Sequence, residues 1–455
     1  MFSPLTVRIV CEPSIHTKND IRIARQLAAQ WNLQQSDTLL IFFGLITISV
    51  NITSIDEDEN LILCSQELLA DLRLPTGYLL HCNYLSSHKQ LILGPIIAIM
   101  TEIKENSASL FGTLSSFCEE LAQLSAQKGC FLYITSLSLW KGTAIQGYKY
   151  ENGQWHKDNM PFPNIVHNRI HSRRTEQTEA FQQWLQLLKN YHIPSFNNRF
   201  LNKWEVHETL DTYVDLQPYL PRSLLLTKKK VLEQALSDYG CIFLKPVYGS
   251  QGKRIFKIAH IDNQYFLDYT TFEENIHQTY SSVRELFSTL KPYIKQPYIV
   301  QQAIDLYTYE ERPVDFRILC HKTEQNIWKA TSSVARVSAK EQFVSNIAMG
   351  GEMHKPMDVL LSTFDKKLAQ RIHKRINALA VETATCISQS YDGLYGELGI
   401  DIGLDKAGNP WIIEINSKPS KNMISSKSKI RPSAHSILNY CCLSARQPYK
   451  EVNSS

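Results

Sequence analysis

Residues 400–416, IDIGLDKAGNPWIIEIN, hold the sharpest local signal in the chain. Two runs of alternating residues enclose an Asp/Gly/Asn turn, and this pattern predicts a β-hairpin. One face of the hairpin is expected to be apolar, and its members are Ile400, Ile402, Leu404, Trp411, Ile413 and Ile415. That face is expected to pack on a helix over residues 368–389. By the same alternation, Ile412 is the only large apolar residue on the other face.

The other face of this hairpin gathers two carboxylates, an amide and two glycines. Asp401, Glu414 and Asn416 supply oxygen atoms, while Gly399 and Gly403 are expected to leave space above the sheet. Hard divalent cations prefer such oxygen ligands, few in number and with room left for phosphate oxygens. The alternative is an edge hairpin whose polar face meets water, but such faces usually carry Lys, Thr and Ser. The pattern therefore favours a metal site.

Residues 242–258, IFLKPVYGSQGKRIFKI, predict two strands joined by a glycine-bearing loop, with Lys245 near the end of the first strand. Such a loop can lay backbone N–H groups against phosphates, and a flanking lysine supplies positive charge. The motif is not a Walker A loop, because Val247 stands where its first glycine is required and Arg254 follows the lysine where Ser or Thr is needed. A glycine-containing hairpin without a ligand is an equal alternative.

Three further segments place polar side chains on predicted strands. Residues 298–305, YIVQQAID, predict a buried strand that turns polar at its end. Residues 312–318 alternate, so that Asp315 and Arg317 share one face, and the next strand carries Arg336. Each segment alone is typical of a structural strand with a surface charge. The order of the segments along the chain indicates more than any one of them.

The order of these segments resembles the ATP-grasp family, and within it the branch of bacillus spore-associated YheC/YheD proteins. The resemblance covers residues 200–430, extends more loosely to residues 90–200, and is least over the first 90 residues. The matching segments are FLNKWE (200–205), LKP (244–246) with its glycine loop, VQQ (300–302), DFR (315–317), Arg336, Ser345-Asn346 with Gly350-Gly351, and Asp401 with EIN (414–416). In the looser part, PNIVHNR (163–169) resembles the α/β domain that precedes ATP-grasp in that branch.

The resemblance implies that ATP lies between two α+β subdomains and transfers its γ-phosphate to a carboxylate. An amine then attacks the acyl phosphate. The residues that would contact ATP are Lys203, Lys245, Gly249, Ser250, Gln251, Gly252, Gln301, Gln302, Ala303, Ile304 and Asp305. The residues that would hold one or two Mg²⁺ ions are Asp401, Glu414 and Asn416. The residues that would act on the transferred phosphoryl group are Arg317, Arg336 and Asn346.

The hinge strand departs from many ATP-grasp enzymes, because Gln301 and Gln302 stand where an acidic residue is common. Asp305 is therefore the candidate for the ribose contact. The roles implied for these residues agree with the chemistry of phosphoryl transfer, because this reaction needs in-line positioning and charge neutralisation more than it needs a general base. Magnesium with surrounding lysines and arginines supplies that electrostatic stabilisation.

Three functions follow from the resemblance. The first is an ATP- and Mg²⁺-dependent ligase that joins a small-molecule carboxylate to an amine, with amino acids or peptides as substrates. The second is a non-catalytic nucleotide-binding protein with a structural or regulatory role in the spore, whose first 90 residues would contact spore coat proteins. The third is an ATP-grasp kinase, which leaves the phosphate on its acceptor.

Sequence alone offers few substrate-binding candidates. Lys340, Lys418 and Lys421 on expected loops are consistent with an acidic substrate, although loop lysines are more often solvated. Asn168 and Arg169 are the candidates from the preceding domain.

With 455 residues the chain is long enough for two or three domains. We expect a multidomain α+β and α/β protein with a β-rich module over residues 1–90, a small α/β domain over 91–198, an ATP-grasp domain over 199–440 and a loosely ordered tail over 441–455. In the first two parts, strands are expected over residues 7–10, 39–43, 46–52, 78–84, 91–100, 130–135 and 165–169, with a hairpin turn at 151–154. Helices are expected over residues 21–30, 115–126 and 181–190.

The composition excludes several classes of protein. A net charge of +4 gives no reason to expect nucleic acid binding. The longest apolar runs are too short to span a bilayer, so no membrane partner is expected. The ten cysteines form no C-x-x-C motif and no zinc-spaced cluster. Since the start carries no secretory signal, we expect thiols in a reduced, cytoplasmic compartment, with spore association implied by the resemblance.

Overall fold

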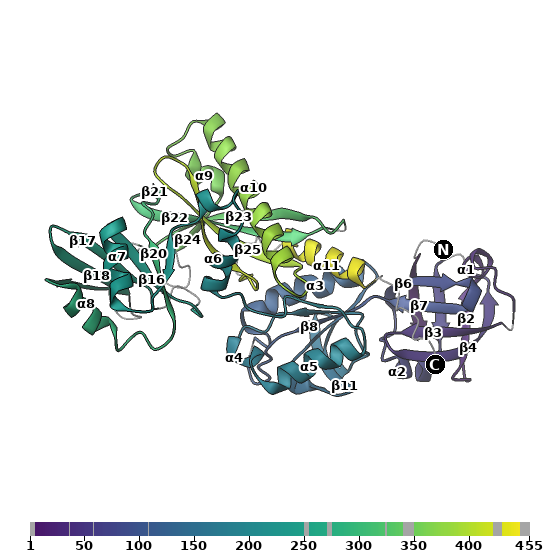
Figure 1. Cartoon of the computed structure of the whole chain (residues 1–455). Helices are drawn as coiled ribbons and strands as arrows, with labels where there is room; N and C mark the ends of the chain where they lie inside the picture. Colours follow the sequence, from purple (N-terminus) through teal and green to yellow (C-terminus); the bar gives the residue numbers. More distant parts are fainter. Residues whose placement is uncertain are drawn as a thin grey trace. The chain divides into compact units, whose positions relative to one another are not determined.

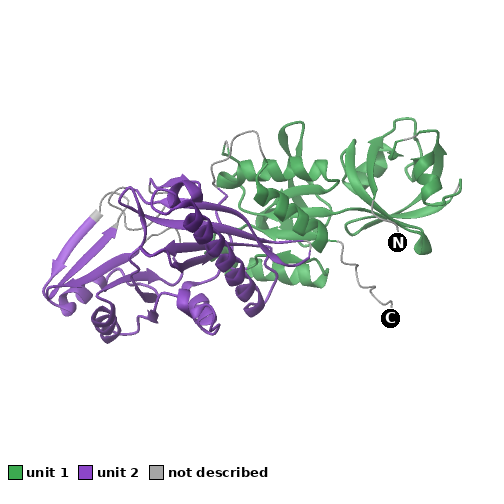
Figure 2. Ribbon diagram, turned by 90° about the horizontal axis from the view of Figure 1, so that it is seen from above, with its two compact units in different colours: residues 1–198, 425–455 green, residues 199–424 purple. Residues whose placement is uncertain are grey.

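The computed structural model describes residues 5–35, 37–57, 59–107, 109–249, 254–270, 275–323, 325–339, 350–421 and 430–445. The chain divides into two compact units, which are coloured separately in Figure 2. Unit 1 comprises residues 1–198 with 425–455, and unit 2 comprises residues 199–424. No helix of the described ranges is both long enough and apolar enough to cross a membrane.

The first part of unit 1 is a closed β-barrel, drawn in purple in Figure 1. Its strand order is β1-β5-β2-β4-β3-β7-β6, and the antiparallel pair β1–β6 closes it. The strands are β1 (Leu5–Cys11), β2 (Asp20–Ala24), β3 (Thr38–Phe43), β4 (Ile46–Ile55), β5 (Leu61–Cys64), β6 (Tyr78–Leu85) and β7 (Gln90–Gly94). The helices of this part are α1 (Arg25–Gln30) and α2 (Gln66–Leu72).

The expected strands over residues 7–10, 39–43, 46–52 and 78–84 are confirmed by β1, β3, β4 and β6. The helix expected over residues 21–30 is wrong in its first half, which forms β2. Ile21 and Ile23 are both fully buried there, because their spacing of two suits a strand lining the barrel. The strand expected over residues 91–100 is two strands, since Pro95 lacks the amide hydrogen that would continue the ladder.

The second part of unit 1 is a sheet in the order β10-β11-β9-β8-β13-β14, with β12 paired to β11. Its strands are β8 (Ile96–Met100), β9 (Phe131–Thr135), β10 (Trp140–Lys141), β11 (Ala144–Glu151), β12 (Gln154–Asn159), β13 (Ile165–Asn168) and β14 (Ser195–Phe196). Its α-helices are α3 (Ser115–Gln127), α4 (Arg173–Glu176), α5 (Glu179–Asn190) and α11 (Pro432–Ser444). The strands expected over residues 130–135 and 165–169, the hairpin at 151–154 and the helices over 115–126 and 181–190 are confirmed.

Alternate residues of β8 point to two different hydrophobic cores. Ile97 and Ile99 pack with α3 and α11, whereas Ala98 and Met100 pack with α5. Helices therefore cover both faces of this sheet, as Figure 1 shows. This arrangement is usual for parallel strands such as β8, β9 and β13.

The end of the chain differs from the sequence-based expectation. The loosely ordered tail was expected to begin at residue 441, yet residues 432–444 form α11. Ile437, Leu438 and Cys441 of this helix are buried against the second part of unit 1. The helix therefore belongs to unit 1, and not to the domain expected over residues 199–440. The composition was misleading because the apolar face of α11 lies among serine-rich segments.

Unit 2 contains two sheets. The first, in the order β15-β20-β16-β17-β18-β19, is covered by α7 and α8. Its elements are β15 (Ser223–Leu225), β16 (Cys241–Pro246), β17 (Phe256–Ile261), β18 (Gln264–Thr270), β19 (Asn275–Tyr280), β20 (Tyr298–Gln302), α7 (Lys229–Tyr239) and α8 (Val283–Leu290). The antiparallel pair β16–β17 and the strand β20 confirm the strands expected on both sides of the glycine loop and over residues 298–305, the last being shorter than expected.

The second sheet runs in the order β24-β23-β22-β25-β26, with β21 paired to β22. Its strands are β21 (Thr308–Tyr309), β22 (Arg312–Lys322), β23 (Trp328–Val337), β24 (Glu352–His354), β25 (Glu397–Leu404) and β26 (Pro410–Asn416). Its core includes residues of three helices, α6 (Lys203–Asp211), α9 (Pro356–Leu360) and α10 (Lys366–Ser390).

Helix α10 confirms the helix expected over residues 368–389. It begins after Asp365, whose side chain accepts hydrogen bonds from the backbone N–H groups of Lys367 and Leu368. Ala369, Ile372 and other residues at helical spacing bury one face against the second sheet. This packing includes the hairpin β25–β26, as the sequence predicted.

From a bulge in the hairpin onward, the residues on its two faces differ from the prediction. A bulge between Asp401 and Ile402 shifts the register, so Ile402 lies opposite Ile412 and Gly403 lies opposite Trp411. Ile412 is consequently buried in the core, while Trp411 is only half-buried and belongs to the other face. A strict alternation could not reveal this shift, because a bulge adds one residue to one strand.

Candidate functional site

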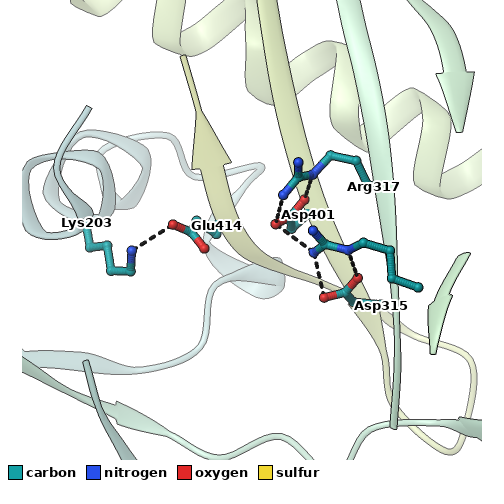
Figure 3. Close-up of polar contacts among 6 residues, drawn as sticks. Lys203, Asp315, Arg317, Asp401 and Glu414 are labelled. Atoms are coloured by element: carbon teal, nitrogen blue, oxygen red, sulfur yellow. Dashed lines mark hydrogen bonds and ion pairs between the residues drawn. The ribbon is translucent and has the colours of Figure 1, made fainter. Parts of the chain in front are cut away.

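Charged residues lie opposite one another on four adjacent strands of the second sheet. Arg317 of β22 lies opposite Asp401 of β25, and Asp401 lies opposite Glu414 of β26. Arg336 of β23 lies opposite Asp315 of β22. Cross-strand partners point to the same face of a sheet, so these side chains gather on one face. Figure 3 shows Arg317, Asp401 and Asp315 in contact through a chain of ion pairs.

Two arginines hold Asp401 from two sides. Arg317 donates from Nε to Asp401 Oδ1 and from Nη2 to Asp401 Oδ2, the second at 2.7 Å. Arg336 donates from Nε and Nη2 to Asp315 at 2.6 and 2.7 Å, and its Nη2 also lies 2.8 Å from Asp401 Oδ2. Burial opposes ionisation, but the guanidinium groups of Arg317 and Arg336 hold the pKa of Asp401 below its usual value. This ion network is charge-balanced and almost fully buried, since the Asp401 side chain is 3% exposed.

Lys203 connects the hairpin to the glycine loop. It is the first residue of α6, which Asn202 caps by accepting from the backbone N–H of Glu205 at 2.8 Å. Lys203 Nζ donates to Glu414 Oε1 at 2.7 Å and to the carbonyl oxygen of Gly249 at 2.9 Å. Burial opposes the ionisation of Glu414, but the Lys203 ammonium lowers the pKa of that carboxyl group. Lys203 therefore joins the edges of both sheets of unit 2.

Lys245 of β16 has a neutral partner. Its Nζ donates to Gln301 Oε1 at 2.6 Å, and Gln301 in turn donates to Ser223 Oγ at 3.0 Å. Burial lowers the pKa of Lys245 to about 8, although the charge of Glu414 favours protonation. Within the ranges that the structure describes, Lys245 forms no ion pair. A desolvated cation of this kind is suited to receive an anion.

The hinge after β20 is held by its backbone. The N–H groups of Gln302 and Ala303 donate to the carbonyl oxygens of Arg222 and Cys241 at 2.8 and 3.0 Å. Asp305 lies on the surface, where it forms an ion pair of 2.6 Å with Lys406. Ile304 between them is half-buried. The residues of this segment that are expected to contact ATP therefore run from strand β20 to the exposed Asp305.

The two glycines of the hairpin are surrounded differently than expected. A Cβ atom at Gly399 would lie 2.7 Å from Pro419 Cβ, and one at Gly403 would lie 2.6 Å from Leu306 Cδ2. The glycines thus admit Pro419 and Leu306, and they leave no open space at their own positions. Asn416, opposite Gly399, has a buried side-chain nitrogen without a hydrogen-bond partner in the described part of the chain.

Several predicted site residues lie outside the described residues, namely Ser250, Gln251, Gly252 and Asn346. Gly249 at the start of the loop is described, and a Cβ atom there would lie 2.3 Å from Pro246 Cγ. A side chain at position 249 is therefore sterically excluded.

Sequence reasoning missed some of the residues that build this site. Asp315 was assigned no role, although its spacing of two from Arg317 placed it on the same face. Lys421, a substrate candidate on an expected loop, is 2% exposed and forms an ion pair with the buried Glu397. Lys418 is 7% exposed, and its Nζ lies 4.8 Å from the ring centroid of Phe200. No local signal marks these two lysines, because burial depends on residues distant in the sequence.

The structure describes two of the three remaining substrate candidates. Lys340 lies outside the described residues. Asn168 and Arg169 of unit 1 are fully buried, and Asn168 Nδ2 donates to Glu176 Oε1 at 3.3 Å. The backbone N–H of Arg169 donates to the carbonyl oxygen of Met100 at 2.7 Å. These contacts hold the end of β13 against α4 and β8.

Residues 192–443 match the family model described as YheC/D like ATP-grasp. The endospore coat-associated protein YheD of Bacillus subtilis (strain 168) is 27% identical over 406 residues, which is 87% of each chain. The endospore coat-associated protein YheC of the same organism is 25% identical over 285 residues, covering 61% of this chain and 76% of YheC. A D-alanine-D-alanine ligase from Coxiella burnetii has a similar structure, with 13% sequence identity, a TM-score of 0.46, and coverage of 77% of this chain and 95% of that one.

The family match spans more than half of the 455 residues and includes both sheets of unit 2. The fold class expected from the sequence is confirmed by this match and by the mixed α+β sheets. The ion network, Lys203 and Lys245 all lie within the matched residues. The chain belongs to the YheC/D-like ATP-grasp family.

Proposed function

We propose that this chain is an ATP- and Mg²⁺-dependent ligase, which activates a carboxylate as an acyl phosphate for attack by an amine. One observation carries the proposal. Each carboxylate assigned to the metal forms an ion pair with a cation assigned to phosphate, Asp401 with Arg317 and Arg336, and Glu414 with Lys203. The residues assigned to the metal and those assigned to phosphate thus lie within ion-pair distance of one another.

The charges in this site favour an anion. Arg317 and Arg336 balance Asp315 and Asp401, and Lys203 balances Glu414. The positive charge of Lys245 is not balanced by an ion pair within the described ranges. Because a buried charge interacts strongly in a medium of low dielectric constant, an anionic ligand such as a nucleotide phosphate is stabilised beside Lys245.

The residues present fit a magnesium ion. Glu414 accepts from Lys203 through Oε1, which leaves Oε2 available, and Asp401 Oδ1 accepts only from Arg317, which leaves it a second lone pair. The side-chain nitrogen of Asn416 has no partner in the described part of the chain, so a flip of the amide presents its oxygen without loss of a hydrogen bond. In the described ranges no group of three His, Cys, Asp or Glu side chains could hold a metal ion, and the proposed set holds two carboxylates and one amide. Water and phosphate oxygens usually complete magnesium coordination.

We assign roles to the residues of this chain on that basis. Asp401, Glu414 and Asn416 would hold Mg²⁺, which when bound neutralises charge on phosphate oxygens. Lys203 and Lys245 bind the phosphates. Arg317 and Arg336 would contact the transferred phosphoryl group and keep it in line with the acceptor.

Nucleotide binding to unit 2 is the first property to test. We expect a non-hydrolysable ATP analogue to raise the unfolding temperature in the presence of Mg²⁺, since a ligand at 100 times its Kd stabilises the native state by about 2.7 kcal/mol. The shift should be lost in Glu414→Gln, because the neutral amide binds the metal weakly. Glu352→Gln, on the exposed edge strand β24, is the matched control and should keep the shift. Equal shifts in both variants would contradict the assignment of Glu414.

Catalysis is tested separately by the release of ADP and phosphate. A ligase releases both only when a carboxylate and an amine are added together, and substrate screening can begin with amino acids and short peptides. A stable phosphorylated product that forms without the amine would instead indicate a kinase. Nucleotide binding without turnover for any pair would favour a structural or regulatory role.

That structural or regulatory role is the second proposal, with the barrel of unit 1 as the part that contacts spore coat proteins. It is supported by the similarity to YheD and YheC, which are endospore coat-associated proteins, and by the 87% coverage of YheD. The same similarity supports a spore-associated location for this chain. Fluorescent tagging of the chain in sporulating cells tests the location, and a diffuse signal throughout sporulation would contradict it.

A further inference from the structure

Two cysteines that are distant in the sequence lie side by side in unit 1. The Sγ atoms of Cys130 and Cys442 lie 3.1 Å apart, although 312 positions separate the residues in the sequence. Cys130 directly precedes β9 and is buried, while Cys442 lies near the end of α11 and is half-buried. All ten cysteines are present as thiols.

The contact between the two thiols is built into the surrounding structure. At the start of α11, Arg431 forms an ion pair of 2.9 Å with Glu120 of α3. Near its end, Asn439 accepts a hydrogen bond of 2.7 Å from Lys128, two residues before Cys130. The face of α11 that carries Ile437, Leu438 and Cys441 is buried in the core that it shares with α3. The helix is thus held at both ends and along its face, which fixes the position of Cys442 against Cys130.

We propose that Cys130 and Cys442 form a disulfide bond, and that unit 1 therefore contains an oxidation site that clamps α11 in place. The oxidant is a small disulfide. The thiolate of the more accessible Cys442 attacks one sulfur of the oxidant, which forms a mixed disulfide and releases the first small thiolate. The sulfur of Cys130 then attacks Cys442 Sγ and releases the second thiolate. Two protein thiols lose two electrons and two protons, and one small disulfide becomes two thiols.

The bond would close a loop that contains all of unit 2. Residues 199–424 lie between Cys130 and Cys442, so the disulfide joins the segments before and after the ATP-grasp part of the chain. Closing so long a loop restricts the unfolded chain more than the folded one, and the oxidised protein should unfold at a higher temperature. The clamp acts on unit 1 and is independent of the ligase proposal.

The other cysteines supply internal controls. Cys441 is adjacent to Cys442 but is fully buried among the residues that pack α11 on α3. Cys11 and Cys64 are opposite each other on the parallel strands β1 and β5, so they form a second pair of neighbouring thiols. A specific site at Cys130 and Cys442 predicts that neither control position takes part.

The full chain is incubated with oxidised glutathione and then denatured, and the remaining thiols are alkylated and counted by mass spectrometry. We expect the count to fall by two from ten, with a peptide containing Cys130 linked to one containing Cys442. Cys130→Ser and Cys442→Ser should each abolish this link, whereas Cys441→Ser should keep it. The oxidised wild-type protein should also unfold at a higher temperature than the reduced protein, and Cys442→Ser should show no difference attributable to the link.

The proposal is overturned if all ten thiols remain, if the link joins Cys11 to Cys64, or if Cys442 retains glutathione without passing the disulfide to Cys130. Circular dichroism of each variant in its reduced form checks that it is folded. Should Cys130→Ser not fold, Cys442→Ser at the less buried position decides the outcome.

Discussion

The two sheets of unit 2 bury positive charge in different ways. In the second sheet, Arg317 and Arg336 are paired with Asp401 and Asp315, so the network is balanced without a ligand. In the first sheet, Lys245 donates a hydrogen bond to the neutral side chain of Gln301, and burial lowers the pKa of Lys245 to about 8. A paired cation becomes available only when its carboxylate binds something else, whereas Lys245 can accept an anion at once. Under the proposed function, Lys245 in the first sheet would bind phosphate, and the paired network in the second sheet would respond to the metal.

The largest effect should follow from breaking the balanced network. Asp401→Asn leaves Arg317 and part of the charge of Arg336 without a carboxylate, and removing one partner of a buried pair costs about 3–5 kcal/mol of unfolding free energy. Urea denaturation measures this loss. Asp358→Asn, in the first turn of α9, is the matched control and should change little. Equal losses in both variants would show that the network contributes no more than a surface carboxylate.

The opposite result is expected at Lys245. Lys245→Met removes a desolvated cation, and its lowered pKa indicates that the ligand-free protein gains about 1–3 kcal/mol of stability. The same variant should lose about 1.5–3 kcal/mol of nucleotide binding energy, because a charge-assisted contact with phosphate disappears. Thermal unfolding and calorimetric titration measure the two effects. Lys245→Arg keeps the charge and should retain most of the binding, so similar affinities for Met and Arg would contradict a phosphate contact.

Nucleotide affinity should also depend on pH through Lys245. Its pKa in the ligand-free protein is about 8, and a bound phosphate raises that value. Binding above pH 8 therefore takes up a proton, and affinity falls by up to about tenfold per pH unit until the pKa of the complex is reached. Below pH 8 the lysine is already protonated and contributes no dependence. Titrations at pH 7, 8 and 9 test this slope.

Lys245→Arg is the control for the pH dependence, since arginine remains charged over this range. Subtracting its profile removes the contribution of every other titrating group, including the nucleotide itself. A slope that persists in the arginine variant would assign the pH dependence to another residue.

The smallest effect should come from the exposed pair at the end of the hinge. Asp305 and Lys406 are 74% and 69% exposed, and an exposed ion pair contributes less than about 1 kcal/mol. Asp305→Asn should therefore leave the unfolding free energy almost unchanged. Asp305 also remains the candidate for the ribose contact, so its nucleotide affinity is measured alongside. A loss of stability as large as that of Asp401→Asn would remove the distinction between buried and exposed pairs.

Local patterns in the sequence predicted much of the fold. The alternation in residues 400–416 predicted the hairpin β25–β26, and helical spacing predicted α10 beneath it. The segment order along the chain led to the family, which the match over residues 192–443 shows. Such signals are readable because strand and helix periods are properties of neighbouring residues.

Long-range structure decided what those patterns left open. The bulge after Asp401 places Ile412 in the core instead of Trp411. The register of β22 with β25 and β23 determines that the arginines pair with acidic residues. The roles assigned to these residues in ATP binding and catalysis remain predictions that the proposed variants test.

The sequence by itself determined the type of most elements, the identity of the charged residues and the family to which the chain belongs. Only the tertiary structure decided which charges are buried together, as for Lys421 with Glu397, and which distant segments meet, as for Cys130 and Cys442. The physical reason is that a pKa, an ion pair or a thiol contact depends on all neighbours in space. Most of those neighbours come from distant positions in the sequence, where no local pattern records them.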